Sequence, residues 1–318
     1  MNAIDFKQLR RQERKQAQYR SSHLHRDDNT NNTSVDDTNN AETHRNLDSK
    51  KTSGEFPAMT AIDPFPSLLP QNTLTEEHRI HASLDSIYYV RQFLNDETCA
   101  EIWNWLRSIP EYECTGSDKN GSGGKVSSGK ESERDESRRH NGRWTRLRHA
   151  RRKVALFDGT LPNHPLPPIL LRLSQTLTAN GAFSSPHSTP NHVLINEYQP
   201  EEGIMAHTDG PAYESCTATI SLGGDVIFKI SPRRRSSSSN GDSEKMQCAR
   251  PLEVVLHGSG SLVVFRNEAY LDHCHEIAEN VLEETTGLNG VCGNDPSGGT
   301  AVKRGYRVSL TFRCKKHA

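Results

Sequence analysis

Three side chains with metal-binding chemistry occur at a spacing that could build one site. His207 and Asp209 are separated by a single residue, so on an extended segment both point to the same face. His275, or its neighbour His273, follows an apolar run over residues 261–265 that has the composition of a strand. Two imidazoles and one carboxylate can hold Fe(II) as a facial triad that leaves three coordination positions open. The sequence therefore predicts an iron site that contains His207, Asp209 and a more distant histidine.

A second chemical signal lies near the C-terminus, over residues 307–313. As a strand, this run would place Arg307 and Arg313 at the two ends of one face, with two hydroxyl residues between them, and three apolar side chains on the other face. A solvated polar face would show the same alternation. Guanidinium groups match carboxylates bidentately, so together with the metal motif the strand predicts a site for a small dicarboxylate.

These motifs together resemble the AlkB-like Fe(II)/2-oxoglutarate dioxygenases, in particular the AlkB homologue six branch. The resemblance extends from about residue 86 to residue 313, with interruptions. It is carried by Asn-His-Val-Leu-Ile-Asn-Glu-Tyr at 191–198, Glu-Gly-Ile-Met-Ala-His-Thr-Asp-Gly-Pro-Ala-Tyr at 202–213, Thr-Ile-Ser-Leu-Gly at 219–223 and the strand at 307–313. It implies an oxidoreductase whose cofactors are Fe(II), 2-oxoglutarate and O2.

The resemblance also implies roles for individual residues. The iron ligands become His207, Asp209 and His275, since the family's last ligand follows Ala-Tyr by several positions and precedes a small residue and Ile. Glu276 departs from that pattern, because a glycine is more usual there. The residues that match the family's 2-oxoglutarate site are Asn196 and Tyr198, Arg307 with Ser309 for the distal carboxylate, and Arg313 near the carboxylate that chelates iron.

The predicted fold is mainly β with supporting helices. A strand is expected over residues 87–93, then a helix capped by Asp96 and stopped by Pro110, and a second helix from residue 168 to 177. The apolar runs at 226–230 and 252–256 predict a hairpin with a long tip. The family resemblance adds the architecture, a double-stranded β-helix or jelly roll.

Composition predicts one folded domain in a chain of 318 residues, because the hydrophobic content is only 32% and the mean hydropathy is −0.78. The expected division is a largely disordered polar region over residues 1–82, with a possible short basic helix, and a dioxygenase domain over residues 83–318. Low-complexity insertions are expected near residues 117–140, 233–247 and 285–299.

Cysteine usage and hydropathy suggest a compartment. Seven scattered cysteines, an odd number, favour a reducing environment over a disulfide framework. No signal peptide and no apolar run of membrane-spanning length stands out, so we expect a monomeric protein of the cytoplasm, the nucleus or both, with no membrane partner.

The sequence indicates the substrate less clearly than it indicates the metal site. A net charge of −1 provides no general attraction to phosphates, but residues 138–153 hold eight Arg or Lys and no acidic residue. A solvated face is the plainer interpretation. If the run instead binds single-stranded nucleic acid, the expected contacts are Trp144, Arg151, Arg152, Lys153 and Tyr213.

Three functions remain open on these grounds. The first is oxidative demethylation of an N-alkylated base in single-stranded DNA or RNA. The second is the same oxygenase mechanism acting on a protein or another substrate. The third is a 2-oxoglutarate-binding regulatory or interaction protein with little turnover, which would have less need of an intact set of metal and co-substrate residues.

Overall fold

The structure, a computed structural model, describes most of the C-terminal three quarters of the chain. The described residues are 73–80, 84, 86–112, 140–147, 150–183, 189–233, 251–284 and 301–316. The expected basic helix near the N-terminus and the three expected insertions (117–140, 233–247 and 285–299) lie outside these residues, apart from His140 and Arg233.

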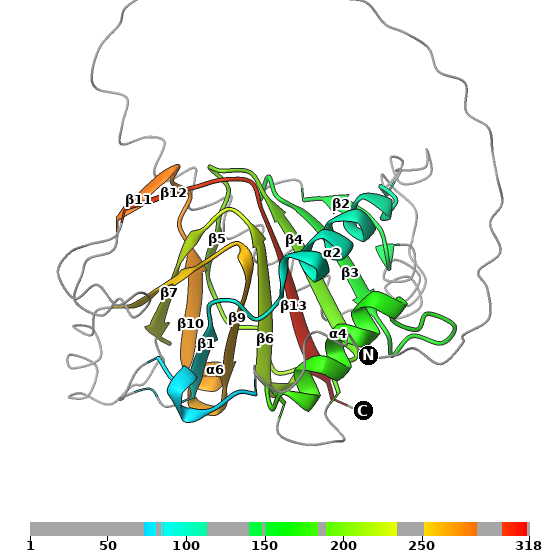
Figure 1. Ribbon diagram of the computed structural model, residues 1–318, viewed down its shortest axis with the longest axis horizontal. Helices are drawn as coiled ribbons and strands as arrows, with labels where there is room; N and C mark the ends of the chain where they lie inside the picture. Colours follow the sequence, from blue (N-terminus) through cyan, green and yellow to red (C-terminus); the bar gives the residue numbers. More distant parts are fainter. Residues whose placement is uncertain are drawn as a thin grey trace, which may run out of the picture.

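The larger of two main sheets has seven strands, and all of its pairings are antiparallel (Figure 1). Its strands in spatial order are β1 (Ile87–Val90), β9 (Ser259–Arg266), β6 (Tyr213–Gly223), β13 (Arg307–Lys315), β4 (His192–Tyr198), β3 (Lys153–Asp158) and β2 (Trp144–Arg146). The predicted arginine-flanked strand is therefore β13, and it lies in the middle of this sheet.

The second main sheet has four antiparallel strands, in the order β5 (Ile204–His207), β10 (His273–Ile277), β7 (Val226–Pro232) and β8 (Leu252–Leu256). The predicted hairpin is confirmed as β7 and β8, with Val226 opposite Leu256. The strands β11 (Leu282–Glu284) and β12 (Ala301–Lys303) form a separate two-stranded sheet. Two facing antiparallel sheets with few helices form the double-stranded β-helix that was predicted.

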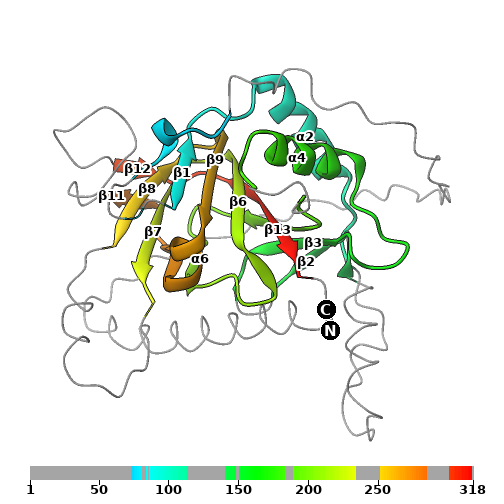
Figure 2. The same cartoon turned by 90° about the horizontal axis from the view of Figure 1, so that it is seen from below.

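Two longer helices, α2 (Asp96–Ser108) and α4 (Pro168–Ala179), cover the larger sheet on the face away from the smaller one (Figure 2). The cap of α2 is Asn95 and not Asp96, because the Asn95 side chain accepts a hydrogen bond from the backbone N–H of Thr98 at 2.9 Å. A short helix, α6 (Asn267–Asp272), connects β9 to β10. Among the described residues, no helix is long and apolar enough to cross a membrane.

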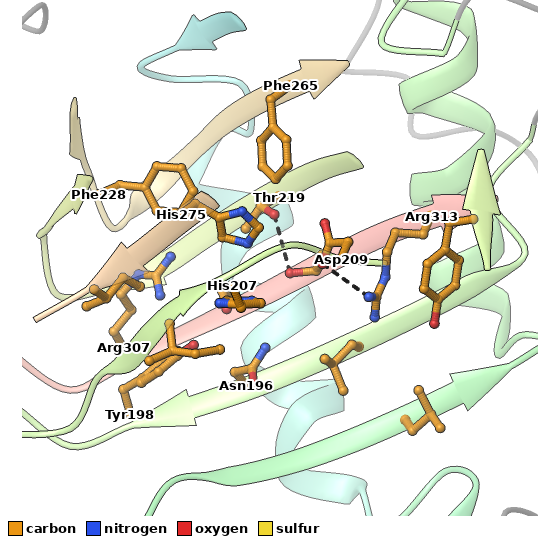
Figure 3. Close-up of a pocket in the computed structure, with 17 residues that line it drawn as sticks. Asn196, Tyr198, His207, Asp209, Thr219, Phe228, Phe265, His275, Arg307 and Arg313 are labelled. Atoms are coloured by element: carbon orange, nitrogen blue, oxygen red, sulfur yellow. Dashed lines mark hydrogen bonds and ion pairs between the residues drawn. The ribbon is translucent and has the colours of Figure 1, made fainter. Parts of the chain in front are cut away.

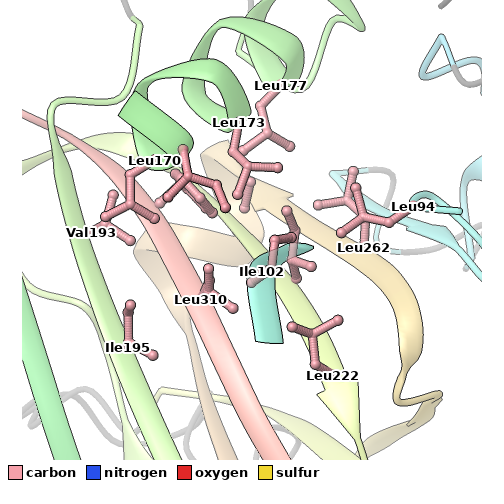
Figure 4. Close-up of a cluster of buried hydrophobic side chains, with 14 of the residues drawn as sticks. Leu94, Ile102, Leu170, Leu173, Leu177, Val193, Ile195, Leu222, Leu262 and Leu310 are labelled. Carbon is pink, nitrogen blue, oxygen red and sulfur yellow. The ribbon is translucent and has the colours of Figure 1, made fainter. Parts of the chain in front are cut away.

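Both faces of the larger sheet are buried. Successive apolar side chains of one strand therefore pack in different clusters, one on each face. In β9, Leu262 and Val264 pack on the helix side, whereas Val263 and Phe265 face the second sheet. Figure 4 shows the helix-side cluster, where three leucines of α4 meet the sheet. Its labelled members are Leu94, Ile102, Leu170, Leu173, Leu177, Val193, Ile195, Leu222, Leu262 and Leu310.

The folded domain begins before the expected boundary at residue 83. Residues 73–80 include the 3-10 helix η2 (Glu76–His78), and the backbone N–H of Leu74 donates to the carbonyl of Asn180 at 2.8 Å. Ile80 is buried in the cluster between the two sheets. Part of the polar N-terminal region therefore packs on the domain.

Shortening Leu310 should destabilise the fold, since this side chain of β13 is fully buried beneath the helices. We expect Leu310→Ala to lower the free energy of unfolding by about 2–5 kcal/mol, from lost burial and the cavity left behind. Leu271→Ala is the matched control, because Leu271 is 53% exposed, and it should change that free energy by less than about 0.5 kcal/mol. Urea denaturation measures both, and equal effects would contradict the assigned core.

Candidate active site

One cavity lies between the two sheets and collects most of the residues singled out by sequence (Figure 3). Its floor comes from β13 and β4 of the larger sheet, and its opposite wall comes from β5, β7 and β10. The lining residues are Leu156, Leu194, Asn196, Tyr198, Ile204, His207, Asp209, Tyr213, Thr219, Phe228, Phe265, His275, Ile277, Arg307, Ser309, Thr311 and Arg313.

Strand pairing brings the two histidines of the metal motif together. His207 ends β5 and lies directly opposite His275 in the antiparallel β5–β10 pair. The start of β5 needs a glycine for this approach, because a Cβ at Gly203 would overlap the carbonyl oxygen of Ile277. The two imidazoles therefore meet through backbone register, with ring centroids 4.2 Å apart.

The predicted triad is present as a cluster of possible metal ligands. One ligand atom from each of His207, Asp209 and His275 lies within 4.8 Å of the others. The Nδ1 of His207 lies 2.8 Å from the carbonyl oxygen of Met205 and must donate to it, since a carbonyl only accepts. This bond fixes the tautomer and leaves the Nε2 of His207 available to a metal.

Asp209 is oriented by bonds to both of its oxygens. The hydroxyl of Thr217 on β6 donates to Oδ2 at 2.7 Å, and Nη1 of Arg313 lies 3.2 Å from Oδ1. The loop itself turns at Gly210, whose φ of 93° favours glycine, and Tyr270 of α6 donates to the Gly210 carbonyl at 2.7 Å. The carboxylate is thus held from the larger sheet, and the loop that follows it is held from α6.

The electrostatics of the cluster suit metal binding. Burial, with the neighbouring His275, lowers the pKa of His207 to about 3. Burial also lowers the pKa of His275, so both imidazoles are in the neutral form that ligates metals. Burial acts to raise the pKa of Asp209, but Arg313 and the two imidazoles outweigh it and hold that pKa below its usual value. Asp209 is therefore ionised, in the form that could ligate a metal.

The structure distinguishes the two candidate histidines of β10. His275 faces the cavity, where its ring lies 5.3 Å from Phe228 and 4.9 Å from Phe265, centroid to centroid. His273 directs its Nδ1 toward the carbonyl of Glu268 at 3.3 Å and does not line the cavity. The geometry agrees with the choice of His275.

At the other end of the cavity lies a buried cation, Arg307. It is 1% exposed, and its Nη2 donates to the hydroxyl of Ser221 at 2.9 Å. Its Nε and Nη1 are buried and make no hydrogen bond to any described residue. Burial lowers the pKa of Arg307 to about 10, so it still carries its charge. Unsatisfied donors on a buried cation are costly, and an anion in the cavity would satisfy them.

Asn196 and Tyr198 stand beside this arginine because β4 pairs with β13. Tyr198 lies opposite Arg307 and Asn196 lies opposite Ser309 in the antiparallel register. The guanidinium of Arg307 lies over the Tyr198 ring, 5.4 Å from its centroid. The four residues that were expected to bind 2-oxoglutarate at this end are thus brought together in one buried patch.

Arg313 is the fifth residue of that set, and it lies next to the metal cluster. Besides its contact with Asp209, its guanidinium lies 4.3 Å from the ring centroid of Tyr213. The Tyr213 ring is in turn 5.1 Å from that of His192. Tyr213 is 1% exposed. Its ring packs on Arg313 and offers no open surface on which a nucleic-acid base could stack.

Two of the expected nucleic-acid contacts are buried, and the structure corrects them. Trp144 is 6% exposed, packs in the helix-side core and donates from Nε1 to the carbonyl of Leu106 at 3.4 Å. Arg152 is fully buried and donates from Nε to Oδ1 of Asn196 at 3.2 Å. Neither side chain is accessible to a polymer. The basic run forms β2 and the start of β3, and both side chains are buried where that hairpin packs on the domain.

The remaining basic residues form an exposed edge. Lys153 is half-buried and pairs with Glu111, with Nζ 2.6 Å from Oε1. Among the described residues of the basic run, the exposed cations are Arg143, Arg146 and Arg151, on and beside the β2–β3 hairpin at the edge of the larger sheet. We call these three residues the edge arginines. Of the expected polymer contacts, only Arg151 is exposed.

Sequence reasoning missed several residues that orient the site. Thr217 and Tyr270 position Asp209 and its loop, and Arg152 contacts Asn196. None of them has a fixed sequence spacing to its partner, because each contact depends on which strands and helices become neighbours. For Thr217 the signal is a polar side chain on the inward face of a strand, which single-sequence alternation alone cannot assign.

Comparison with known proteins places this geometry in a family. Residues 86–313 match the model of the 2OG-Fe(II) oxygenase superfamily. The chain is 32% identical over 180 residues to the probable RNA/DNA demethylase ALKBH6 of Danio rerio. The aligned segment covers 54% of this chain and 73% of that protein. It is 28% identical over 129 residues to the tRNA (carboxymethyluridine(34)-5-O)-methyltransferase ALKBH8 of Macaca fascicularis, covering 39% of this chain and 17% of that one.

Solved structures with some likeness include that of OsALKBH1, at 14% identity and a TM-score of 0.38, covering 72% of this chain and 97% of that one. A prolyl-4-hydroxylase of Pseudomonas putida matches at 12% identity and a TM-score of 0.39, covering 73% and 94%. The assignment rests on the sequence match, which spans most of the chain. The chain belongs to the 2OG-Fe(II) oxygenase superfamily and is an AlkB-like dioxygenase that uses Fe(II), 2-oxoglutarate and O2.

Proposed function

We propose that His207, Asp209 and His275 hold the Fe(II) of this enzyme, and that the cavity beside them holds 2-oxoglutarate. The observation that carries the proposal is the shared cavity. Three ligand atoms within 4.8 Å of one another line the same space as Arg307, a buried cation with two nitrogens that make no hydrogen bond to the described residues. A metal at one end and a carboxylate at the other would satisfy both sets of groups.

The protein residues have distinct tasks under this proposal. Arg307, with Ser309 nearby, binds the distal carboxylate, and Asn196 and Tyr198 contact the co-substrate from β4. Phe228 and other apolar side chains exclude water from the metal cluster. The bound iron supplies the oxidation chemistry, with 2-oxoglutarate and O2 at the positions that three protein ligands leave open.

We propose further that the substrate is an N-methylated base in single-stranded DNA or RNA. In the balanced reaction, the N-methyl group, O2 and 2-oxoglutarate give the N–H base, formaldehyde, succinate and CO2. Two observations support this class of substrate. A relative at 32% identity is named a probable RNA/DNA demethylase, and the edge arginines lie on and beside the β2–β3 hairpin, whose strand β3 pairs with β4, which lines the cavity. Single strands are favoured because an unpaired base reaches a buried site at least cost.

Removing an iron ligand should abolish metal binding without unfolding the domain. We expect His207→Ala and His275→Ala to weaken binding of Mn(II), used as a stand-in for Fe(II), by more than the ~10–100-fold that loss of an outer hydrogen-bond partner costs. Isothermal titration in the presence of 2-oxoglutarate measures the affinity. His273→Ala is the matched control and should bind as the parent does. If His273→Ala loses the metal and His275→Ala keeps it, the assigned ligand is wrong.

Replacing Arg307 should weaken 2-oxoglutarate binding. We expect Arg307→Ala to raise the dissociation constant by at least about tenfold, because a charge-assisted hydrogen bond in a buried site contributes roughly 1.5–3 kcal/mol. Arg307→Lys should recover little of this loss, since an ammonium cannot reproduce the bidentate fork. Titration of the Mn(II)-loaded protein gives the values. Unchanged affinity in both variants would show that the co-substrate binds elsewhere.

The substrate proposal is tested by turnover and by salt dependence. With Fe(II), 2-oxoglutarate and O2, a panel of N-methylated single-stranded oligonucleotides should yield demethylated bases by mass spectrometry, and duplexes should react more slowly. Replacing Arg143, Arg146 and Arg151 by Ser should flatten the slope of log affinity against log salt by about 2, since each phosphate contact contributes about 0.7 on single strands.

The matched control for that variant removes three exposed cations elsewhere. Substituting Arg79, Arg107 and Lys303 by Ser changes the net charge equally but leaves the hairpin intact, and it should keep the parent slope. If no oligonucleotide binds or reacts even at low salt, nucleic acid is excluded. A panel of peptides would then be the next class of substrate to assay for succinate formation.

A further inference from the structure

Arg152 is a buried cation that belongs neither to the metal cluster nor to the arginines of β13. It lies one residue before β3 and is fully buried. Val154, two residues later, pairs with Asn196 of β4, and Leu156 lines the cavity. Since alternate residues share a face, Arg152 belongs to the face of β3 that looks toward the cavity. A buried cation is costly unless it is paired or hydrogen-bonded, so the groups that Arg152 contacts decide what it does.

One hydrogen bond of Arg152 is to Asn196, a residue proposed above to contact 2-oxoglutarate. Nε of Arg152 donates to Oδ1 of Asn196 at 3.2 Å, and both residues are buried. A guanidinium offers only donors, whereas a primary amide has one accepting end and one donating end. The contact therefore fixes which way the Asn196 amide is turned. With Oδ1 held by Arg152, Nδ2 is directed elsewhere, and Figure 3 shows the amide nitrogen on the side of His207.

We propose that Arg152 is a positioning residue for 2-oxoglutarate. It holds the Asn196 amide so that the NH2 group donates to co-substrate oxygens. Without Arg152 the amide can turn over and present Oδ1 to those oxygens, which replaces an attraction by a repulsion. The inference rests on the co-substrate site proposed above and adds a residue from outside the cavity lining.

Two simpler roles predict different behaviour. A phosphate contact needs an accessible side chain, and Arg152 has no exposed surface. A purely electrostatic role, in which the charge attracts the 2-oxoglutarate dianion, would act whether or not Asn196 is present. Positioning acts only through Asn196, so the effects of changing the two residues must be non-additive.

A double-mutant cycle on the full-length, Mn(II)-loaded protein tests this distinction, with 2-oxoglutarate affinity measured by titration. We expect Arg152→Met and Asn196→Ala each to weaken binding about tenfold, as the loss of one charge-assisted or polar contact does. The double variant should be no more than about threefold weaker than Asn196→Ala. An additive loss of about 100-fold would overturn the positioning role. Arg172→Met, which removes a half-buried cation that pairs α4 with Glu101 of α2 on the helix side of the larger sheet, is the control and should bind as the parent does.

Two further variants keep the test decisive. Arg152→Lys carries the cycle if Arg152→Met does not fold, and it should also be non-additive with Asn196→Ala. Asn196→Asp keeps an acceptor for Arg152 but loses the NH2 donor, so it should bind 2-oxoglutarate at least as weakly as Asn196→Ala. Affinity like that of the parent in Asn196→Asp would overturn the inference.

A structural role of Arg152 would leave a different signature. It would lower the melting temperature equally in the parent and Asn196→Ala backgrounds and would not track the KM for 2-oxoglutarate. If Asn196→Ala and Arg307→Ala both leave 2-oxoglutarate affinity unchanged, the co-substrate site itself is misplaced and the inference falls with it. An intact effect of Asn196→Ala with additive behaviour of Arg152 removes only the positioning role.

Discussion

The contact between Asp209 and Arg313 is the interaction on which the site depends most. Arg313 belongs to β13 of the larger sheet, whereas Asp209 follows β5 of the smaller one, so the 3.2 Å contact joins the two sheets at the metal cluster. A buried ion pair stabilises only when its remaining polar atoms are satisfied, because both charges lose their hydration. Here Thr217 donates to the carboxylate and the Tyr213 ring covers the guanidinium. The pair thereby fixes both the carboxylate proposed to bind iron and one end of the cavity proposed to hold 2-oxoglutarate.

Strand β13 shows how one segment serves stability and chemistry together. Its apolar side chains, Val308, Leu310 and Phe312, complete the helix-side core, which holds the strand rigidly in the middle of the sheet. The opposite face then presents Arg307 and Arg313 at fixed positions in the cavity. A site on a central strand, supported by a packed core, keeps its geometry more precisely than one on a loop. The low conformational freedom of the arginines is thus a consequence of the apolar alternation.

Sequence alone predicted the parts of the site that follow from local periodicity. The alternation in residues 307–313 and the His207–Asp209 spacing both survive in the structure, because each places side chains on one face of an extended segment. What it could not predict was partnership between distant elements. Trp144 and Arg152 looked like polymer contacts within a basic run, yet that run becomes β2 and the start of β3, which bury both side chains. The cap at Asn95 was missed for a smaller reason, since Asn and Asp are adjacent and both are good caps.

The burial of Arg152 changes how a nucleic-acid substrate would have to be recognised. Among the described residues of the β2–β3 hairpin, the exposed cations are the edge arginines, and the chain as a whole has a net charge of −1. On single strands each phosphate contact adds about 0.7 to the slope of log affinity against log salt, so the three edge arginines by themselves would give only a shallow dependence on salt. Arg307, Arg313 and Arg152 are buried and hydrogen-bonded to neighbouring buried side chains, so burial keeps these three cations from contacting the phosphates of a polymer.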